Sequence, residues 1–381
     1  MHFDFNLYST PLLFGFLQGW IYAVLFWGRS RRSGRLSDLF FGCLLAALSF
    51  EIWEYMLGFG GIEILWQELE FFPRNFGLLI PALAWWYLKM QFNPGYRLRR
   101  GDALHALPFL LYVVYHLLVF AQGPEFVAQW KSAVHFPFGI HLLEDLLKLA
   151  LEIIYFFKAL RLYIQYRNWA PSQFSNIETI SFQWFRNFLL AFLASSVTGW
   201  SMTLLDIWWQ LDFWHDWWDE LFQAGLIYYL GITGYAQTQP RQLKFEGADK
   251  PIETTAETQK PAQVPDAETQ QLKARLETLM QQEKPWLDPD LSLSDLARQL
   301  QTNGSVLSAV INRGFGKNFN DYINDHRVEA VKAMLGDPAV AHLSLLGISM
   351  ECGFNSKSTF NRAFKKAVGV PPGTFMSQSK A

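Results

Sequence analysis

The stretch Ile348-Ser-Met-Glu-Cys-Gly-Phe-Asn-Ser-Lys-Ser-Thr-Phe-Asn-Arg-Ala-Phe-Lys-Lys366 predicts two short helices joined by a tight turn. Residues 345–352 make the first helix, Gly353-Phe354-Asn355 make the turn, and residues 356–366 make the second helix. Phe360, Ala363 and Phe364 recur at the spacing of one buried helix face. The pattern therefore predicts a helix-turn-helix unit whose second helix turns polar and basic side chains outward.

A second unit of the same kind precedes the first in residues 291–312. Ser294 can cap its first helix, and Asn303-Gly304 break the chain before its second helix. The apolar positions that form its buried faces are Leu296, Ala297, Leu300, Leu307, Val310 and Ile311. Residues 319–335 predict one longer helix between the two units. We therefore expect two helix-turn-helix units joined by a linking helix.

These residues resemble the AraC/XylS-type DNA-binding domain over about ninety positions. The likeness rests on the 348–366 stretch, with its G-F-x-S-x-S-x-F-x-R-x-F-K-K pattern, on Phe319-Asn-Asp-Tyr-Ile-Asn-Asp-His-Arg-Val-Glu-Ala330, and on Gly369-Val-Pro-Pro-Gly-Thr-Phe375. The resemblance implies that the second helix of each unit enters the major groove of double-stranded DNA, in successive turns on one face.

Base edges and phosphates require hydrogen-bond donors, acceptors and cations on such helices. The second unit supplies Lys357, Ser358, Thr359, Asn361, Arg362, Lys365 and Lys366, and the first supplies Ser305, Ser308, Asn312 and Arg313. Ala309 stands where members of the resembling family often have a basic base-reading residue. Lys365 and Lys366 have an alternative interpretation as a solvated helix end that complements the helix dipole. We expect Arg327 to be structural.

Residues 241–266 are rich in Pro, Thr, Ala and Glu and predict a flexible linker. Residues 267–381 then form the DNA-binding domain. Its first helix, residues 267–282, places Leu272, Leu276 and Leu279 on one face with Met280 beside them. These side chains either pack against the domain or form a short seam of a homodimer.

Residues 1–240 hold only half of the charges of the chain, and their apolar runs reach the ~20 residues that cross a bilayer. The sequence predicts seven spans, at residues 9–28, 37–58, 75–92, 103–121, 140–160, 183–205 and 220–237. Together with the C-terminal units they predict an all-α protein, a seven-helix transmembrane bundle followed by a cytoplasmic double helix-turn-helix domain.

Basic residues follow every odd-numbered span. They are Arg29, Arg31, Arg32, Arg35, Arg97, Arg99, Arg100, Lys158, Arg161, Arg167, Arg241 and Lys244. Because cytoplasmic loops collect Lys and Arg, the N-terminus is expected outside and the chain after Pro240 in the cytoplasm. The first span lacks the features of a cleaved signal and is expected to remain as an anchor.

Ionisable residues within spans are costly and suggest function. The candidates for signal sensing are Glu51, Glu54, His141, Glu144, Asp145 and Lys148, with Glu152 on the same helix and Trp214 in the outer connection. The polar residues either stabilise packing within the bundle or line a ligand cavity open to the outside. A metal site has weak support, because one histidine among carboxylates is a poor ligand set. If the stripe lines the site, Glu144→Gln should shift the response to the signal.

The outer connection, residues 206–220, combines acidic residues with Trp208, Trp209, Trp214, Trp217 and Trp218. Tryptophan is typical of the membrane interface. The same surface would also suit a sugar or a cationic ligand through ring stacking and cation–π attraction.

No HExxH, GxSxG or Walker sequence occurs in residues 1–240, so neither an enzyme nor a cofactor is expected. The motifs Leu78-Leu-Ile-Pro-Ala-Leu-Ala-Trp-Trp-Tyr87, His105-Ala-Leu-Pro-Phe-Leu-Leu-Tyr112 and Glu283-Lys-Pro-Trp-Leu-Asp-Pro-Asp-Leu-Ser-Leu293 are similar to a group of bacterial regulators that join a seven-span sensor to this domain. This resemblance implies a regulator in the bacterial inner membrane, surrounded by lipid, that couples an unknown signal to DNA binding. The alternative is a small-molecule transporter or receptor with an autoregulatory DNA-binding appendage.

Overall fold

The computed structural model describes residues 2–93, 96–176, 182–237, 266–335 and 342–379. Helices are the regular elements of these residues, and no strand is found among them. The all-α prediction is therefore confirmed for the described part of the chain. The chain divides into two compact units, one of Met1–Tyr163 with Gln183–Ala248 and the other of Ile164–Phe182 with Asp249–Ala381.

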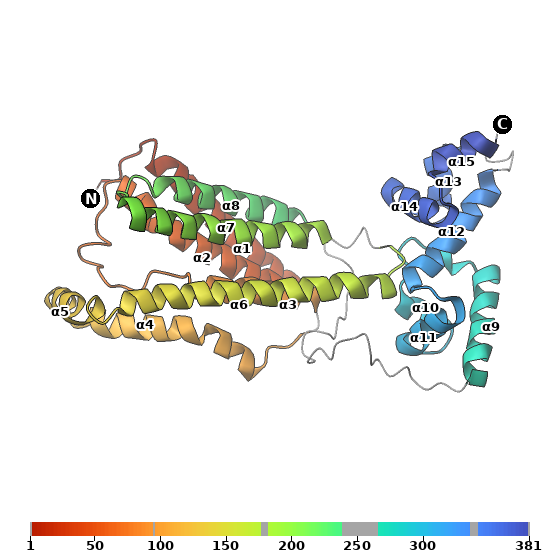
Figure 1. Cartoon of the computed structure of the whole chain (residues 1–381), viewed down its shortest axis with the longest axis horizontal. Helices are drawn as coiled ribbons and strands as arrows, with labels where there is room; N and C mark the ends of the chain where they lie inside the picture. The colour runs from red at the N-terminus through yellow and green to blue at the C-terminus, as the bar shows by residue number, and fades with distance from the viewer. Residues whose placement is uncertain (1, 94–95, 177–181, 238–265, 336–341, 380–381) are drawn as a thin grey trace. The chain divides into compact units, whose positions relative to one another are not determined.

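The first unit is a helical bundle (Figure 1). Its helices are α1 (Ser9–Ser33), α2 (Leu36–Phe59), α3 (Ile80–Phe92), α4 (Leu107–Phe120), α5 (Pro124–Trp130), α6 (Ile140–Trp169), α7 (Phe182–Trp209) and α8 (Trp217–Ala236). A 3₁₀ segment, Arg100–Ala106, leads into α4. The last six residues of α6 and the first residue of α7 belong to the second unit.

Among the described residues, four helical stretches are long and apolar enough to cross a membrane, namely α1, α2, Arg100–Phe120 and α7. The seven predicted spans all contain helix, but α3 has only 13 residues, fewer than the ~20 that a bilayer requires. The α6 and α8 helices are long enough to cross a bilayer, but polar residues that line a cavity interrupt their apolar faces.

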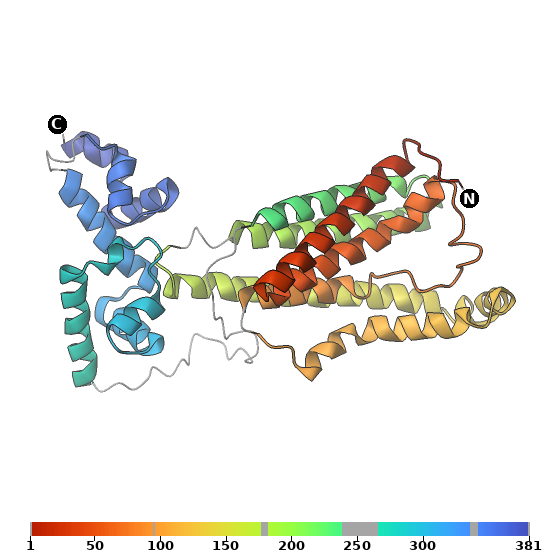
Figure 2. The same ribbon diagram turned by 180° about the vertical axis from the view of Figure 1, so that it is seen from behind.

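Small residues bring α1 against α2 and α8, and these three helices cross closely in Figure 2. A Cβ atom on Gly15 would lie 2.6 Å from the Cβ of Ala224, and one on Gly19 would lie 1.9 Å from the Ser49 hydroxyl. Tight helix contact therefore depends on glycine at these two positions of α1.

At one end of these helices Arg29 makes a bidentate ion pair with buried Asp38 at 2.8 Å.

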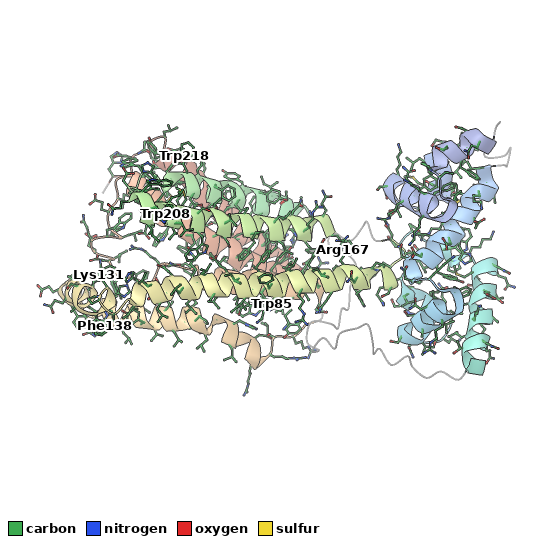
Figure 3. The ribbon with its side chains drawn as sticks, viewed as in Figure 1. Trp85, Lys131, Phe138, Arg167, Trp208 and Trp218 are labelled. Carbon is green, nitrogen blue, oxygen red and sulfur yellow. The ribbon has the colours of Figure 1, made fainter. Side chains whose placement is uncertain are left out.

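Large apolar side chains project outward from α4, α6 and α7 (Figure 3). Leu111, Leu118 and Leu143 are more than half exposed, as are Trp208 and Trp218, which Figure 3 labels near one end of the bundle. Contiguous apolar exposure of this kind is rare on proteins surrounded only by water. The outward faces of these helices therefore need an apolar environment.

The second unit contains two helix-turn-helix pairs at opposite ends of α12 (Figure 1). Its helices are α9 (Asp266–Gln282), α10 (Leu293–Gln299), α11 (Gly304–Phe315), α12 (Phe319–Leu335), α13 (Leu345–Glu351), α14 (Lys357–Val368) and α15 (Pro372–Ser379). The helix cap predicted at Ser294 is wrong. Ser292 caps α10 instead, because its hydroxyl accepts from the Asp295 amide at 3.2 Å.

Each pair has its own hydrophobic core, and α12 contributes to both. Tyr322 and Ile323 pack with α9, α10 and α11, whereas Val328 and Val331 pack with α13 and α14. Leu276 and Met280 of α9 are buried in the first core, together with Leu272. The prediction that α9 packs against the domain is confirmed, and these side chains are not available for a dimer seam.

The predicted flexible linker, residues 241–266, lies outside the described residues except for Asp266, where α9 begins.

Candidate functional sites

The exposed face of α14 carries most of the residues predicted to contact DNA. Ser356 caps the helix by accepting from the Thr359 amide at 3.1 Å, and Phe360 and Phe364 bury its inner face. Lys357, Ser358, Asn361, Arg362, Lys365 and Lys366 are all exposed. This face therefore presents four cations, an amide and a hydroxyl with no carboxylate among them.

Thr359 corrects the sequence prediction. The residue is only 1% exposed, and its hydroxyl accepts from the Ser356 hydroxyl at 2.9 Å. Position 359 faces inward because it lies one helical turn before Ala363, which packs against the core on the buried side of α14. Thr359 therefore helps to begin α14 and does not present its hydroxyl to DNA.

Lys366 has a partner that the sequence did not indicate. Its ammonium group lies 2.7 Å from both carboxylate oxygens of Asp321 on α12. This exposed ion pair joins the end of α14 to the linking helix, so Lys366 is partly neutralised.

The turn before α14 requires glycine. Gly353 has a φ of +85°, and a Cβ atom at this position would lie 2.5 Å from the carbonyl oxygen of Trp286. The predicted turn is therefore present, and it holds the second helix-turn-helix pair against the segment before α10.

The corresponding helix of the first pair, α11, is much less basic. Asn303 caps it by accepting from the Val306 amide at 2.9 Å, and Gly316 ends it with a φ of +66°. Ser305, Asn312 and Arg313 are exposed, while Ser308 is half-buried and accepts a 3.5 Å hydrogen bond from Asn312. Arg313 is the single cation that α11 offers.

Comparison with known proteins agrees with this geometry. The family described as "Helix-turn-helix domain" matches residues 296–378, which include both helix pairs and α12. Residues 296–378 form an AraC-type DNA-binding domain. No solved structure matched the chain.

Two of the curated relatives are each similar to about a quarter of the chain. The uncharacterized HTH-type transcriptional regulator YtdP of Bacillus subtilis (strain 168) is 27% identical over 94 residues, which are 25% of this chain and 12% of that protein. The melibiose operon regulatory protein of Escherichia coli (strain K12) is 29% identical over 93 residues, 24% of this chain and 30% of that protein. The chain thus spans less than a third of the length of either relative.

The AraC-type domain has a buried polar centre at Arg327 of α12, which is 1% exposed. Its guanidinium donates to the backbone carbonyls of Trp286 and Asp288, each at 2.7 Å, and to Asn324 at 3.3 Å. Burial lowers the pKa of Arg327 to about 10, so the side chain is still charged at neutral pH. Arg327 is therefore structural, as the sequence analysis expected.

A segment far away in the sequence docks on the same centre. Arg327 also donates to the Ser175 hydroxyl at 3.2 Å, and the side-chain amide of Asn320 donates to the Ser175 carbonyl at 2.8 Å. The Ser175 amide and hydroxyl both donate to the Leu291 carbonyl, at 3.2 and 2.7 Å. Residues 164–182, which follow the polar part of α6, thereby become part of the unit that contains the AraC-type domain. Sequence reasoning missed this contact.

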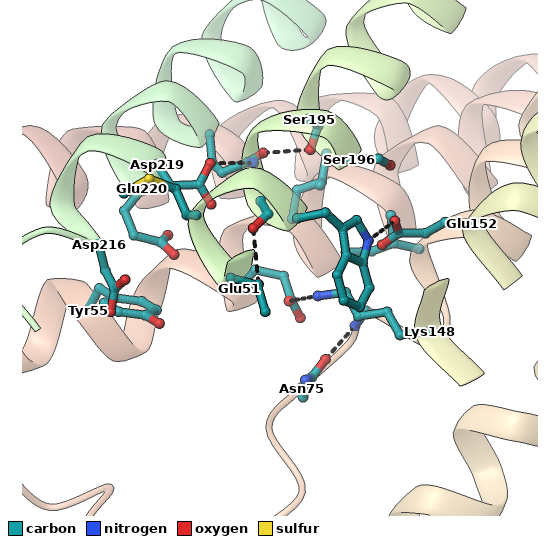
Figure 4. Close-up of a pocket in the computed structure, with 18 of the residues that line it drawn as sticks. Glu51, Tyr55, Asn75, Lys148, Glu152, Ser195, Ser196, Asp216, Asp219 and Glu220 are labelled. Carbon is teal, nitrogen blue, oxygen red and sulfur yellow. Dashed lines mark hydrogen bonds and ion pairs between the residues drawn. The ribbon is translucent and has the colours of Figure 1, made fainter. Parts of the chain in front are cut away.

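The first unit contains a polar cavity of about 440 Å³ (Figure 4). It is lined by α2, the segment before α3, α6, α7, Asp216 and α8. Eight carboxylates face it, those of Glu51, Glu54, Asp145, Glu152, Asp206, Asp216, Asp219 and Glu220, against two cations, Arg74 and Lys148. This charge imbalance makes the cavity strongly acidic.

The two cations neutralise only part of this charge. Arg74 makes a bidentate ion pair with Glu54 at 2.8 Å. Lys148 lies 3.9 Å from Glu51, whose other oxygen accepts from the Phe76 amide at 2.6 Å. A Cβ atom on Gly77 would lie 2.7 Å from Lys148, so glycine makes room for this side chain.

Four of the predicted sensing residues, Glu51, Glu54, Asp145 and Lys148, line this cavity, and three do not. Glu144 instead bonds to His116 of α4 at 3.1 Å, and His141 packs on Phe136. Successive residues of a helix point about 100° apart, so α6 presents 144 and 145 to different neighbours. The single polar stripe predicted for α6 is therefore two separate surfaces.

Trp214 is the other correction. Its ring packs against Tyr8 and Phe59, with centroids 5.0 and 5.3 Å away, and it does not line the cavity. Four acids of the outer connection, Asp206, Asp216, Asp219 and Glu220, do line it. The sequence analysis placed the acids of residues 206–220 with the tryptophans, as a surface for a sugar or a cation, and not with the polar residues of α6. The concentration of these acids between two spans was the signal that could have identified them.

Proposed function

We propose that the chain is a membrane-embedded one-component transcription regulator, in which a signal bound in the acidic cavity changes DNA binding by the AraC-type domain. The seven helical regions of residues 1–240 are proposed to cross the bacterial inner membrane with the N-terminus outside. The acidic cavity, beside the outer connection, then opens toward the outside, and the DNA-binding helices lie in the cytoplasm.

The main support for this proposal is that α6 is one uninterrupted helix. The first half of the helix bears Asp145, Lys148 and Glu152, which line the acidic cavity. The same helix runs to Trp169, and the segment that follows it reaches Arg327 through Ser175. A ligand that changes the position or order of α6 would therefore act on the linking helix of the DNA-binding domain.

The outward apolar faces of α4, α6 and α7 support the membrane location, because lipid supplies the apolar environment that they require. Basic residues after the odd-numbered spans support the orientation.

The two recognition helices are proposed to contribute unequally to DNA recognition. Lys357→Ala should lower discrimination between the operator and single-base variants more than Ser308→Ala does, because only Lys357 is a long exposed donor. Band-shift titrations with the full chain in lipid nanodiscs would measure both ratios. Equal losses, or a greater loss for Ser308→Ala, would show that α11 reads bases through hydroxyl groups or water.

Genomic mapping tests the regulator proposal directly. DNA cross-linked to the full chain in living cells should fall at a small set of sites, and deletion of the chain should change transcription beside them. A Lys357→Ala, Arg362→Ala double variant should remain in the membrane and lose these sites.

Unaltered transcription in the deletion strain, together with solute uptake that depends on the chain, would overturn the proposal in favour of a transporter with a DNA-binding appendage. The cavity is the observation that keeps this second function open.

A further inference from the structure

We propose that the acidic cavity binds a small organic dication, a protonated diamine or polyamine, with Glu220 as its buried anchor. This inference deepens the proposed function, because it names the chemical class of the signal.

Glu220 is the observation that points to a ligand. The residue is 8% exposed, lines the cavity from α8, and its Oε2 atom has no hydrogen-bond partner among the described residues. An ionised carboxylate has only acceptor sites, so it requires a donor. Leaving a buried carboxylate without a donor or a cation is unfavourable, and a bound ammonium group would supply both.

The other acids of the cavity show the same excess of acceptors. Glu152 accepts from the indole of Trp200 at 2.8 Å, and Asp219 accepts from the hydroxyl of Thr198 and from the amide of Gln223, the latter at 3.5 Å, so only neutral donors reach these two acids. Six of the eight carboxylates have no basic side chain within 4 Å in the described structure: those of Asp145, Glu152, Asp206, Asp216, Asp219 and Glu220. A ligand that compensates these carboxylates must therefore carry positive charge.

The arrangement of these carboxylates favours an organic cation over a metal ion. No group of three or more His, Cys, Asp or Glu residues in the described part of the chain could hold a metal. A volume of about 440 Å³ lies in the range of small-molecule sites, roughly 300–1,000 Å³. Tyr55 and Trp200 add ring faces on which an ammonium or its carbon chain can rest.

The carboxylates lie on opposite walls of the cavity. This arrangement favours a ligand with two separated positive charges over a ligand with one. Asp216, Asp219 and Glu220 lie on the α8 side and Glu152 on the α6 side, as Figure 4 shows. A ligand with an ammonium group at each end of a short carbon chain would meet both walls. An anion would be repelled, and a neutral molecule would leave the carboxylates uncompensated.

The test is calorimetric titration of the full chain in lipid nanodiscs with four-carbon ligands of different charge, and with spermidine as a longer amine. We expect 1,4-diaminobutane or the longer spermidine to bind, and butane-1,4-diol and succinate to bind at least tenfold more weakly. Preference for the diol or for succinate, or no binding of either amine, would overturn the proposal.

Glu220→Gln should weaken binding of the amine at least tenfold, because it keeps the shape of the side chain and removes its charge. Glu144→Gln is the matched control, since Glu144 faces His116 outside the cavity, and it should leave the affinity unchanged. Asp216→Asn provides a second variant if Glu220→Gln fails to insert. Unchanged affinity in the variants that insert would reject this cavity as the amine site.

Operator binding by the same nanodisc samples separates the two proposals. Operator binding without amine binding would overturn the ligand class and leave the regulator proposal intact. Amine binding by a chain that binds no operator would keep the ligand class and overturn the regulator.

Discussion

Arg327→Met is expected to lower the free energy of unfolding of the AraC-type domain by about 3 kcal/mol or more. The guanidinium satisfies the carbonyls of Trp286 and Asp288 in an environment where Arg327 is almost completely buried. Each hydrogen bond to a charged group contributes about 1.5–3 kcal/mol, and a buried carbonyl left without a donor is costly. Urea-dependent proteolysis of the full chain in detergent micelles, read on the C-terminal fragment, would measure this loss.

Arg298→Met is the matched control for this substitution. Its side chain is 79% exposed on α10 and pairs with Asp295 at 3.2 Å, so the change should stay within about 0.5 kcal/mol. A loss of less than about 1 kcal/mol in Arg327→Met would contradict the structural role assigned to Arg327.

Arg362→Ala, and separately Asn361→Ala, should weaken binding of the full chain to its operator by ~1–3 kcal/mol, the contribution of one bidentate contact with a base. Both side chains are exposed on α14, whose inner face stays packed through Phe360 and Phe364, so the domain should remain folded. Band-shift titrations on operator and on random DNA, at one salt concentration, would measure the two losses.

Lys332→Ala is the control, because it removes one positive charge from α12 outside both recognition helices. It should leave discrimination between operator and random DNA unchanged. An equal loss on both kinds of DNA for Arg362→Ala would show that Arg362 contacts only phosphate, and the base-reading role would then be withdrawn.

Local patterns in the sequence were sufficient to predict the helices of the DNA-binding domain and their outward faces. The spacing of Phe360 and Phe364 predicts the buried side of α14, and this in turn predicts that Asn361, Arg362 and Lys365 are exposed. Thr359 was misassigned because its hydroxyl suggested exposure, although it lies one helical turn before Ala363 on the buried face. Helix period is a property of a few neighbouring residues, so it can be read from one segment.

The two polar centres depend on partners far away in the sequence. Arg327 and Ser175 are 152 positions apart in the sequence. Glu220 lines the same cavity as Asp145 and Glu152 because α8 and α6 both border that cavity. The amino-acid sequence is enough to show which residues of α6 and α8 are polar. The folded structure is needed to show that Glu144 turns toward His116 while Asp145 lines the cavity, because long-range packing sets which neighbour lies across each helix face.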